Sequence, residues 1–318
     1  MRGILVAGDR SGSGKTSISL ALAALLSREM KVQTFKVGMD YIDPSYLTGV
    51  TARPCRNLDT FVMKESEIRA IFDHGCRDAD LALVEGVRGL YEGAEALSEI
   101  GSSASVAKIL DLPVVLVVNA RSITRSAAAL VKGFQGFDPD VRICGVILNN
   151  VSGKKHIDKT VSAVEHYCGI PVIGAIPRME EMELAMRHLG LVPFREGQEH
   201  GEFRQRIERI TGLIGEHVDR ERFLSLGKQF RPGTSDRSLF REREKKEIQI
   251  GIAYDEAFNF YYSDLFDLLA AWGIRVTLFS PLRDHLPDAD GYIIGGGYPE
   301  LFLSELAENS SLREEIRE

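Results

Sequence analysis

One short segment, residues 8–16 (GDRSGSGKT), combines three glycines with a lysine and a threonine. It follows an apolar run and precedes a helix-period stretch, so its backbone N–H groups can turn toward an anion at a helix N-terminus. In such loops the lysine reaches the β- and γ-phosphates and the threonine hydroxyl is a ligand for Mg²⁺. The segment therefore predicts a nucleoside triphosphate site. The candidate nucleotide-binding residues are Gly12, Ser13, Gly14, Lys15, Thr16 and Ser17.

The spacing of this loop differs from the common motif, which has glycine six residues before the lysine. Asp9 stands at that position, and Gly8 stands seven residues before Lys15. A longer loop of this kind is similar to that of dethiobiotin synthetase. It is also similar to the loop of partition ATPases, which carries a lysine where this chain has Arg10. Both similarities imply ATP binding.

Charged side chains follow a second apolar run, in FKVGMDYIDP (35–44). The carboxyl end of a strand in an open α/β sheet faces the ligand crevice. Lys36 can therefore supply positive charge to a transferring phosphoryl group, and Asp40 can hold Mg²⁺ directly or through water. A polar loop that ends in a proline turn is the alternative interpretation.

Two further strand ends carry polar residues, in LVEGVRGLYEG (83–93) and GVILNNV (145–151). A carboxylate such as Glu85 is costly to bury unless it is paired or bound to a metal. Glu85 is therefore expected to complete a Mg²⁺ site with Thr16 and Asp40, with a helix cap as the alternative. The carboxamide of Asn149 can hydrogen-bond an adenine edge, although asparagine is also a common turn residue.

The elements that position these side chains alternate between strands and helices over the first 192 residues. Several strands are continuously apolar, as parallel strands covered on both faces must be. Helix-period stretches such as Thr16–Met30 and Ile123–Phe137 lie between them. We expect a doubly wound α/β domain with a mainly parallel sheet. The expected strands are Ile4–Gly8, Val32–Gly38, Leu81–Glu85, Val114–Asn119, Cys144–Val151 and Pro171–Ile176.

The pattern changes over residues 196–247, where two helical stretches lead into RPGTSD (231–236) and REREKKE (241–247). This composition predicts a helical and charged connection between residues 1–195 and a second α/β unit at 248–318. The expected strands of that unit are 248–254, 274–280 and the start of 290–300, and its expected helices are 261–272 and 301–318. Because three strands are few for a doubly wound domain, the unit is expected to be incomplete.

Length and composition agree with this plan and limit the partners. A chain of 318 residues allows roughly two domains of ~150 residues. Its net charge of −7 argues against nucleic acid or an anionic membrane as partner, and no apolar run approaches the ~18 residues of a membrane span. The four cysteines lack metal-ligand spacing, which predicts reduced thiols in a cytoplasmic protein. They are Cys55, Cys76, Cys144 and Cys168.

Ten segments in the same order make the sequence similar to the cobyrinate a,c-diamide synthase family. The resemblance includes the branch that amidates Ni-sirohydrochlorin on the way to coenzyme F430 of methanogenesis. The segments are 8–16, KVGMDYIDP (36–44), RPCRNLD (53–59), VEGVRGLYEG (84–93), GSSASVAKIL (101–110), GVILNNV (145–151), RHLGLV (187–192), DEAFNFYY (255–262), FSPLRD (279–284) and GGGYPEL (295–301).

The resemblance implies a P-loop domain of dethiobiotin synthetase type, followed by part of a triad-type (class I) glutamine amidotransferase domain. It implies ATP- and Mg²⁺-dependent amidation of the a and c acetate side chains of a tetrapyrrole, Ni-sirohydrochlorin or cobyrinate. Glutamine or ammonia would supply the nitrogen, which displaces phosphate from an acyl phosphate. The catalytic candidates are Lys15, Lys36, Asp40 and Glu85.

The resemblance also implies a substrate side. Two positions depart from the cobyrinate-forming enzymes, which usually carry Met at the place of Arg88 and Asp at the place of Glu92. An arginine can hold a ring carboxylate with two hydrogen bonds, which favours the Ni-sirohydrochlorin branch, and a surface arginine without a role is equally open. The other substrate-side candidates are Tyr41, Asp43, Arg187 and His188.

Gly295, Gly296 and Gly297 resemble a loop that supplies oxyanion-binding N–H groups in triad glutaminases. Such enzymes also need a cysteine on a strand–helix elbow, and all four cysteines precede residue 169. We therefore expect 248–318 to hydrolyse no glutamine, while ammonia can still support amidation. A homodimer is the default assembly. The rival functions are a dethiobiotin-synthetase-like carboxylase and a partition-type ATPase switch.

Overall fold

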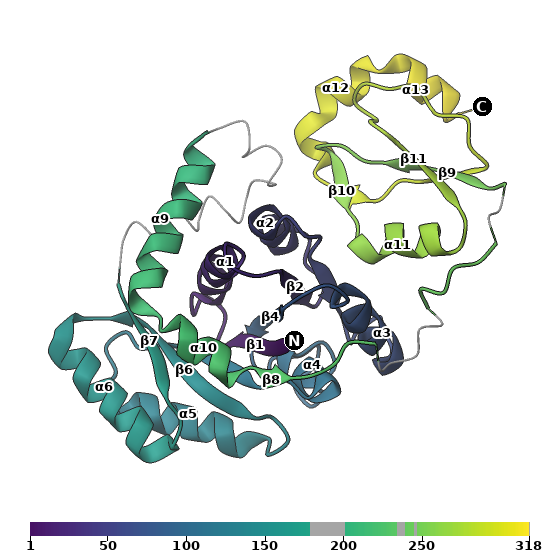
Figure 1. The fold of residues 1–318 in the computed structure, drawn as a ribbon. Coiled ribbons are helices and arrows are strands. Elements are labelled where there is room, and N and C mark those ends of the chain that lie inside the picture. Colours follow the sequence, from purple (N-terminus) through teal and green to yellow (C-terminus); the bar gives the residue numbers. More distant parts are fainter. Residues whose placement is uncertain (179–200, 234–238, 245–246, 318) are drawn as a thin grey trace. The chain divides into compact units, whose positions relative to one another are not determined.

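The computed structural model describes residues 1–178, 201–233, 239–244 and 247–317 (Figure 1). The chain divides into two compact units, Met1–Ser235 and Asp236–Glu318. Among the described residues, no helix combines the length and the apolar character that crossing a membrane requires.

The first unit contains an eight-stranded sheet in the order β3-β2-β4-β1-β5-β6-β7, in which these neighbours are parallel. The eighth strand, β8, pairs antiparallel with the start of β1. The order reverses direction at β1, which lies between β4 and β5, and such switch points are where open α/β sheets bind ligands. The strands are β1 (Arg2–Gly8), β2 (Val32–Val37), β3 (Arg56–Leu58), β4 (Leu81–Gly89), β5 (Val114–Asn119), β6 (Ile143–Val151), β7 (Val172–Pro177) and β8 (Lys228–Gln229).

Helices connect these strands, which confirms the expected doubly wound α/β domain (Figure 1). The apolar residues 4–7 of β1 are fully buried, as a strand covered on both faces requires. Ile18 of α1 and Ile214 of α9 join Ile4 and Val6 in one core cluster. The described helices of this unit are α1 (Lys15–Leu26), α2 (Ile42–Thr51), α3 (Glu65–Gly75), α4 (Ser103–Leu110), α5 (Arg125–Phe137), α6 (Gly153–Cys168), α9 (Gly201–His217) and α10 (Arg220–Leu226).

Part of the expected connection at 196–247 packs on the first unit. Ile214 of α9 and Phe223 of α10 are fully buried in the core of the sheet, and β8 pairs through Arg2 and Gln229. These residues therefore do not form a solvated linker. The compact unit continues to Ser235, while the functional domain limits stay a prediction.

The second unit has a three-stranded parallel sheet in the order β11-β9-β12 and a small antiparallel pair, β10-β13. The expected strands are present, but the single helix expected at 301–318 was wrong. It is divided because the Asn309 side chain accepts a hydrogen bond from the Leu312 N–H and begins a new helix. The elements are β9 (Gln249–Ala253), β10 (Phe258–Phe260), α11 (Ser263–Ala271), β11 (Arg275–Phe279), β12 (Gly291–Ile293), β13 (Gly296–Gly297), a 3₁₀ turn (Pro299–Phe302), α12 (Leu303–Glu308) and α13 (Ser310–Glu315).

Candidate nucleotide-binding site

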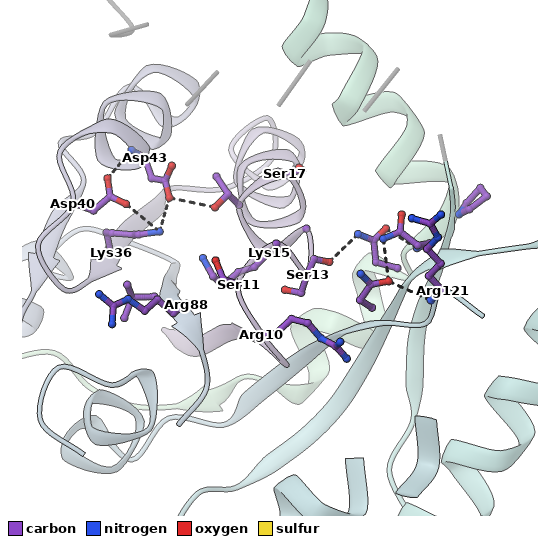
Figure 2. A pocket seen from close by; sticks show the side chains of 18 residues that line it. Arg10, Ser11, Ser13, Lys15, Ser17, Lys36, Asp40, Asp43, Arg88 and Arg121 are labelled. Carbon is purple, nitrogen blue, oxygen red and sulfur yellow. Dashed lines mark hydrogen bonds and ion pairs between the residues drawn. The ribbon is translucent and has the colours of Figure 1, made fainter. Parts of the chain in front are cut away.

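A cavity of about 460 Å³ opens at the carboxyl-end edge of the first unit's sheet, around the glycine-rich loop (Figure 2). On one side of the loop lie Lys36, Asp40, Asp43 and Arg88, and on the other side lies Arg121. The lining also includes Arg10, Ser11, Gly12, Ser13, Gly14, Lys15, Thr16, Ser17, Val87, Asn119, Asn149, Asn150 and Pro177. The structure therefore brings most of the predicted site residues to one place.

The loop itself has the geometry of a phosphate-binding turn. Gly12 and Gly14 have φ angles of 76° and 93°, a left-handed conformation that glycine adopts without strain. Gly14 also lacks room for a side chain, because a Cβ there would collide with the Asn149 amide nitrogen. Gly14 caps the N-terminus of α1, so backbone N–H groups and the helix dipole face the cavity.

Three side chains converge on one buried carboxylate oxygen. Glu85 is 1 % exposed, and its Oε1 accepts hydrogen bonds from Lys15 Nζ at 2.9 Å and Thr16 Oγ1 at 2.7 Å. Lys36 Nζ donates to the same atom at 2.8 Å. The ammonium groups of Lys15 and Lys36 thus lie beside the Thr16 hydroxyl, which was predicted to be a Mg²⁺ ligand. Charge pairing of this kind is what permits the burial of a carboxylate at the end of an apolar strand.

Asp43, rather than Asp40, approaches the Thr16 hydroxyl. Asp43 Oδ2 accepts from Thr16 Oγ1 at 3.2 Å and from Lys36 Nζ at 2.5 Å. Asp40 Oδ1 instead accepts the backbone N–H groups of Ile42 and Asp43, at 2.9 and 3.1 Å, and its Oδ2 lies 3.5 Å from Lys36 Nζ. Asp40 therefore holds the first turn of α2. The spacing Asp-x-x-Asp before a helix carried that signal, because a carboxylate there commonly accepts N–H groups of the first turn.

Burial and pairing shift the pKa values of these groups in different directions. Burial lowers the pKa of Lys15. Burial also acts to lower the pKa of Lys36, but Glu85 and Asp43 outweigh it and raise that pKa. For Glu85, burial is outweighed by the two lysines, which hold the pKa well below its usual range. Burial and the charge of Glu85 raise the pKa of Asp43 to about 6. The anionic form of Glu85 is therefore the stable one, with two ammonium partners.

The donor set fits a magnesium ion. The hydroxyl of Thr16 and the carboxylates of Asp43 and Glu85 are hard oxygen ligands, which Mg²⁺ prefers together with phosphate oxygens. Glu85 Oε2 is buried and has no hydrogen-bond partner among the described residues. Within that same part of the chain, no cluster of three or more His, Cys, Asp or Glu side chains is arranged for a metal.

The Asn149 amide hydrogen-bonds the phosphate loop and is not left free to face the cavity. It is 6 % exposed, its Nδ2 donates to the Ser13 carbonyl at 2.8 Å, and its Oδ1 accepts from the Asn150 N–H at 2.9 Å. The geometry favours support of the loop, and contact with adenine stays a prediction. Sequence reasoning missed Asn119 and Arg121, which also line this end of the cavity. A polar residue at the end of the apolar run VVLVVN was the available signal.

The structure separates the substrate-side candidates. Arg88 is exposed, has a φ angle of 46° and lines the cavity, and its Nη1 lies 3.5 Å from the Gly93 carbonyl. Tyr41 is half-buried at the start of α2 and does not line the cavity. Arg187 and His188 lie outside the described residues.

The glycine triplet of the second unit is held by its own unit. The Gly295 N–H donates to the Tyr261 hydroxyl at 2.7 Å, and Gly296 and Gly297 form β13. A Cβ on Gly297 would collide with the Ala257 carbonyl oxygen, so this position requires glycine. Its role as an oxyanion loop stays a prediction.

All four thiols lie in the first unit and are free of disulfides. Burial raises the pKa of each of them, that of Cys144 to about 11. A thiol is nucleophilic as the thiolate, so none of these cysteines has the environment of a catalytic nucleophile.

Comparison with known proteins places both units in described families. Residues 4–192 match the "CobQ/CobB/MinD/ParA nucleotide binding domain", and residues 249–318 match the "CobB/CobQ-like glutamine amidotransferase domain".

Three methanogen proteins named cobyrinate a,c-diamide synthase are similar over nearly the whole chain. The Methanosarcina acetivorans protein is 53 % identical over 99 % of this chain and 66 % of its own length. The Methanobrevibacter smithii protein is 45 % identical over 99 % and 70 %, and the Methanocaldococcus jannaschii protein 44 % over 100 % and 71 %. The chain thus spans about two thirds of these relatives. Among solved structures, FtsY of Elizabethkingia anophelis matches with a TM-score of only 0.43 and 16 % identity, over 57 % of this chain and 60 % of its own.

Proposed function

We propose, because the chain belongs to the cobyrinate a,c-diamide synthase family, that it forms amides on the a and c acetate side chains of a tetrapyrrole at the expense of ATP. The observation that carries the proposal is the buried cluster of Lys15, Lys36 and Glu85 beside the phosphate loop. It sets two ammonium groups where the γ-phosphate of a nucleotide on this loop would lie.

In the proposed first step, a substrate carboxylate oxygen attacks the γ-phosphorus and the bond to the β-phosphate oxygen breaks, which gives an acyl phosphate and ADP. Lys15 and Lys36 would stabilise the negative charge on the transferring group. Thr16, Asp43 and Glu85 would hold a magnesium ion, which supplies charge neutralisation on the phosphates when bound. Asp40 would act on this site through the first turn of α2 and through Lys36.

In the second step, the lone pair of ammonia attacks the acyl carbon, the bond to the phosphate oxygen breaks, and the nitrogen loses a proton to give the amide. Water must be kept from the acyl phosphate, so the site has to close around the substrate. Glutamine is the proposed nitrogen source of the complete reaction, since residues 249–318 match an amidotransferase domain and carry the glycine triplet. Because 248–318 are expected to hydrolyse no glutamine, free ammonia is the proposed donor for this chain. Free ammonia would replace glutamine.

Neither rival function gains support. A carboxylase or a partition-type switch has no need of an amidotransferase domain, and residues 249–318 match one. The substrate is proposed to be Ni-sirohydrochlorin or cobyrinate, and the exposed guanidinium of Arg88 favours the former as a holder of one more ring carboxylate. Participation in F430 formation and methanogenesis, Mg²⁺ use, a homodimer, and a cytoplasmic location without nucleic-acid or membrane partners remain parts of the proposal.

The test is product formation. The protein is incubated with ATP, Mg²⁺ and ¹⁵N-ammonium or ¹⁵N-amide glutamine, with Ni-sirohydrochlorin or cobyrinate as acceptor, and products are identified by mass spectrometry. With ammonium we expect one and then two ¹⁵N amides on one of these tetrapyrroles, and with glutamine we expect none. Diaminopelargonate with bicarbonate serves as the carboxylase control. ATP hydrolysis without an amide on either tetrapyrrole, even with ammonium in excess, would refute the proposal.

A further inference from the structure

Exposed apolar side chains gather on one edge of the first unit. In its described part, seven large apolar side chains are exposed, and five of them lie on the three loops that follow β2, β3 and β4. The other two, Phe137 and Tyr167, lie on α5 and α6. We name the five the apolar rim: Met39, Phe61, Val62, Leu97 and Ile100.

Hydrogen bonds hold the three loops together as one surface. Asn57 Nδ2 donates to the carbonyls of Gly38 and Asp40, at 3.0 and 2.8 Å, which ties the loop after β2 to β3. Thr60 Oγ1 accepts from the Gly101 N–H at 2.6 Å, which ties the loop after β3 to the one after β4. Residues of both these loops also line a second hollow, of about 350 Å³. The rim is therefore built on braced loops.

The rim adjoins the phosphoryl-transfer end of the nucleotide cavity. Met39 precedes Asp40, which lines that cavity, and Gly38 lies against Val87, another lining residue. Figure 2 shows Lys36, Asp40, Asp43 and Arg88 on the same side of the phosphate loop, away from Arg121. Two of the three loops of the rim extend from β2 and β4, the strands that carry Lys36 and Glu85. A molecule on the rim can therefore reach these residues.

The chemistry of this surface selects a particular occupant. Exposed apolar patches on soluble proteins mark ligand or protein contacts, and aromatic and aliphatic side chains stack well on flat conjugated rings. Beside them, the exposed Arg88 makes one long hydrogen bond within the described part of the chain, to the Gly93 carbonyl at 3.5 Å. The loop after β4 also carries three exposed glutamates: Glu92 accepts from the Gly89 N–H, Glu99 pairs with Lys108, and Glu95 lies two residues before Leu97. An apolar face with the exposed Arg88 at its edge complements a conjugated ring that carries carboxylates at its edge.

We propose that the apolar rim seats the macrocycle of the tetrapyrrole substrate. Phe61, Val62 and Leu97 contact a face of the ring, while Arg88 binds one edge carboxylate. The acetate to be phosphorylated then points toward Lys36. This inference rests on the proposed function, and it adds the surface that binds the ring.

The test compares Phe61→Ser, Leu97→Ser and the double variant with a control, Tyr167→Ser, which removes an exposed aromatic side chain on α6. Cobyrinate and Ni-sirohydrochlorin are titrated into the full chain and followed by their visible absorbance. ATP affinity and thermal unfolding are measured in parallel. We expect the double variant to bind the tetrapyrrole at least about tenfold more weakly and to have a raised KM with an unchanged kcat. ATP affinity should stay as in the parent, and Tyr167→Ser should behave as the parent.

Unchanged tetrapyrrole binding in a folded double variant would overturn the inference. So would loss of self-association in sedimentation with unchanged tetrapyrrole binding, because the rim would then contact a second copy of the chain. The proposed function fails separately: weaker ring binding in the rim variants, with no amide formed by the parent, would support the rim and refute amidation. Normal amidation with normal ring binding in all three rim variants would refute only the proposed role of the rim.

Discussion

Glu85 is the residue on which the candidate chemistry depends most. Its Oε1 contacts both lysines and the Thr16 hydroxyl. In Glu85→Gln the amide cannot restore the charge, so we expect a raised Mg²⁺ requirement and phosphoryl transfer slower by about a thousandfold or more. The two buried ammonium groups would also lose a partner, at a cost of roughly 3–5 kcal/mol in unfolding free energy. Mg²⁺ titration of ATP turnover, together with denaturant unfolding, measures both effects. Parent-like Mg²⁺ dependence would place the metal elsewhere.

The two aspartates of the loop after β2 give a paired prediction. Because Asp43, and not Asp40, accepts from Thr16, Asp43→Asn should raise the Mg²⁺ requirement much as Glu85→Gln does. Asp40→Asn keeps an oxygen that can accept the N–H groups of Ile42 and Asp43, so its Mg²⁺ requirement should change less. Mn²⁺ binding in the presence of a non-hydrolysable ATP analogue, followed by electron paramagnetic resonance, distinguishes them. A larger loss of Mn²⁺ in Asp40→Asn than in Asp43→Asn would restore Asp40 as the ligand.

At this scale the sequence indicated which residue types meet, but not every partner. Lys15, Thr16 and Glu85 could be predicted because a phosphate loop and a strand-end carboxylate share one edge of a parallel sheet. Which aspartate faces Thr16 could not be predicted. Asp40 and Asp43 lie three residues apart at the start of α2, and the direction of that helix decides which of them approaches Thr16. The partner of Asn149 could not be predicted either, because its amide can hydrogen-bond a nucleotide base or a backbone carbonyl equally well.

The contact between β6 and the phosphate loop gives a prediction for Asn149. Its amide donates to the Ser13 carbonyl, so loss of this hydrogen bond should loosen the loop whatever base the nucleotide carries. In Asn149→Ala we expect binding of ATP, GTP and inorganic tripolyphosphate to weaken by a similar factor, about tenfold. Calorimetry with the three ligands measures this. Asn119→Ala, at the same end of the cavity, is the control and should leave tripolyphosphate unaffected. Weaker ATP binding with normal tripolyphosphate binding in Asn149→Ala would support adenine contact instead.

Elements could be predicted where packing alone determines them. The buried parallel strands β1, β5 and β6 are continuous apolar runs, so periodicity identified them. β3 was not expected, because its residues Arg56 and Asn57 are polar and yet buried. Asn57 is required there to bind the carbonyls of the neighbouring loop, a tertiary demand that no local pattern expresses. The packing of α9 on the sheet was missed for the same reason, since its charged face dominates the local composition.

For the whole molecule, the described groups proposed for phosphoryl transfer all belong to the first unit, and the second unit has its own small core of Ala253, Phe279 and Leu312. Disruption of that core should therefore leave ammonia-dependent chemistry in place. Leu312→Ala should destabilise the second unit by roughly 2–5 kcal/mol. We expect amidation of the tetrapyrrole with ammonium to keep the parent kcat.

The measurement combines ammonium-dependent amidation with native-state hydrogen exchange, which reports the two units separately. Exchange should accelerate over β9, β11 and β12 in Leu312→Ala and stay slow over β1 and β5. Val117→Ala, in the fully buried β5, is the matched core truncation in the first unit. It should accelerate exchange there and reduce the amount of active enzyme. If Leu312→Ala abolished ammonium-dependent amidation while β1 and β5 stayed protected, the second unit would have to contribute directly to the ligase site.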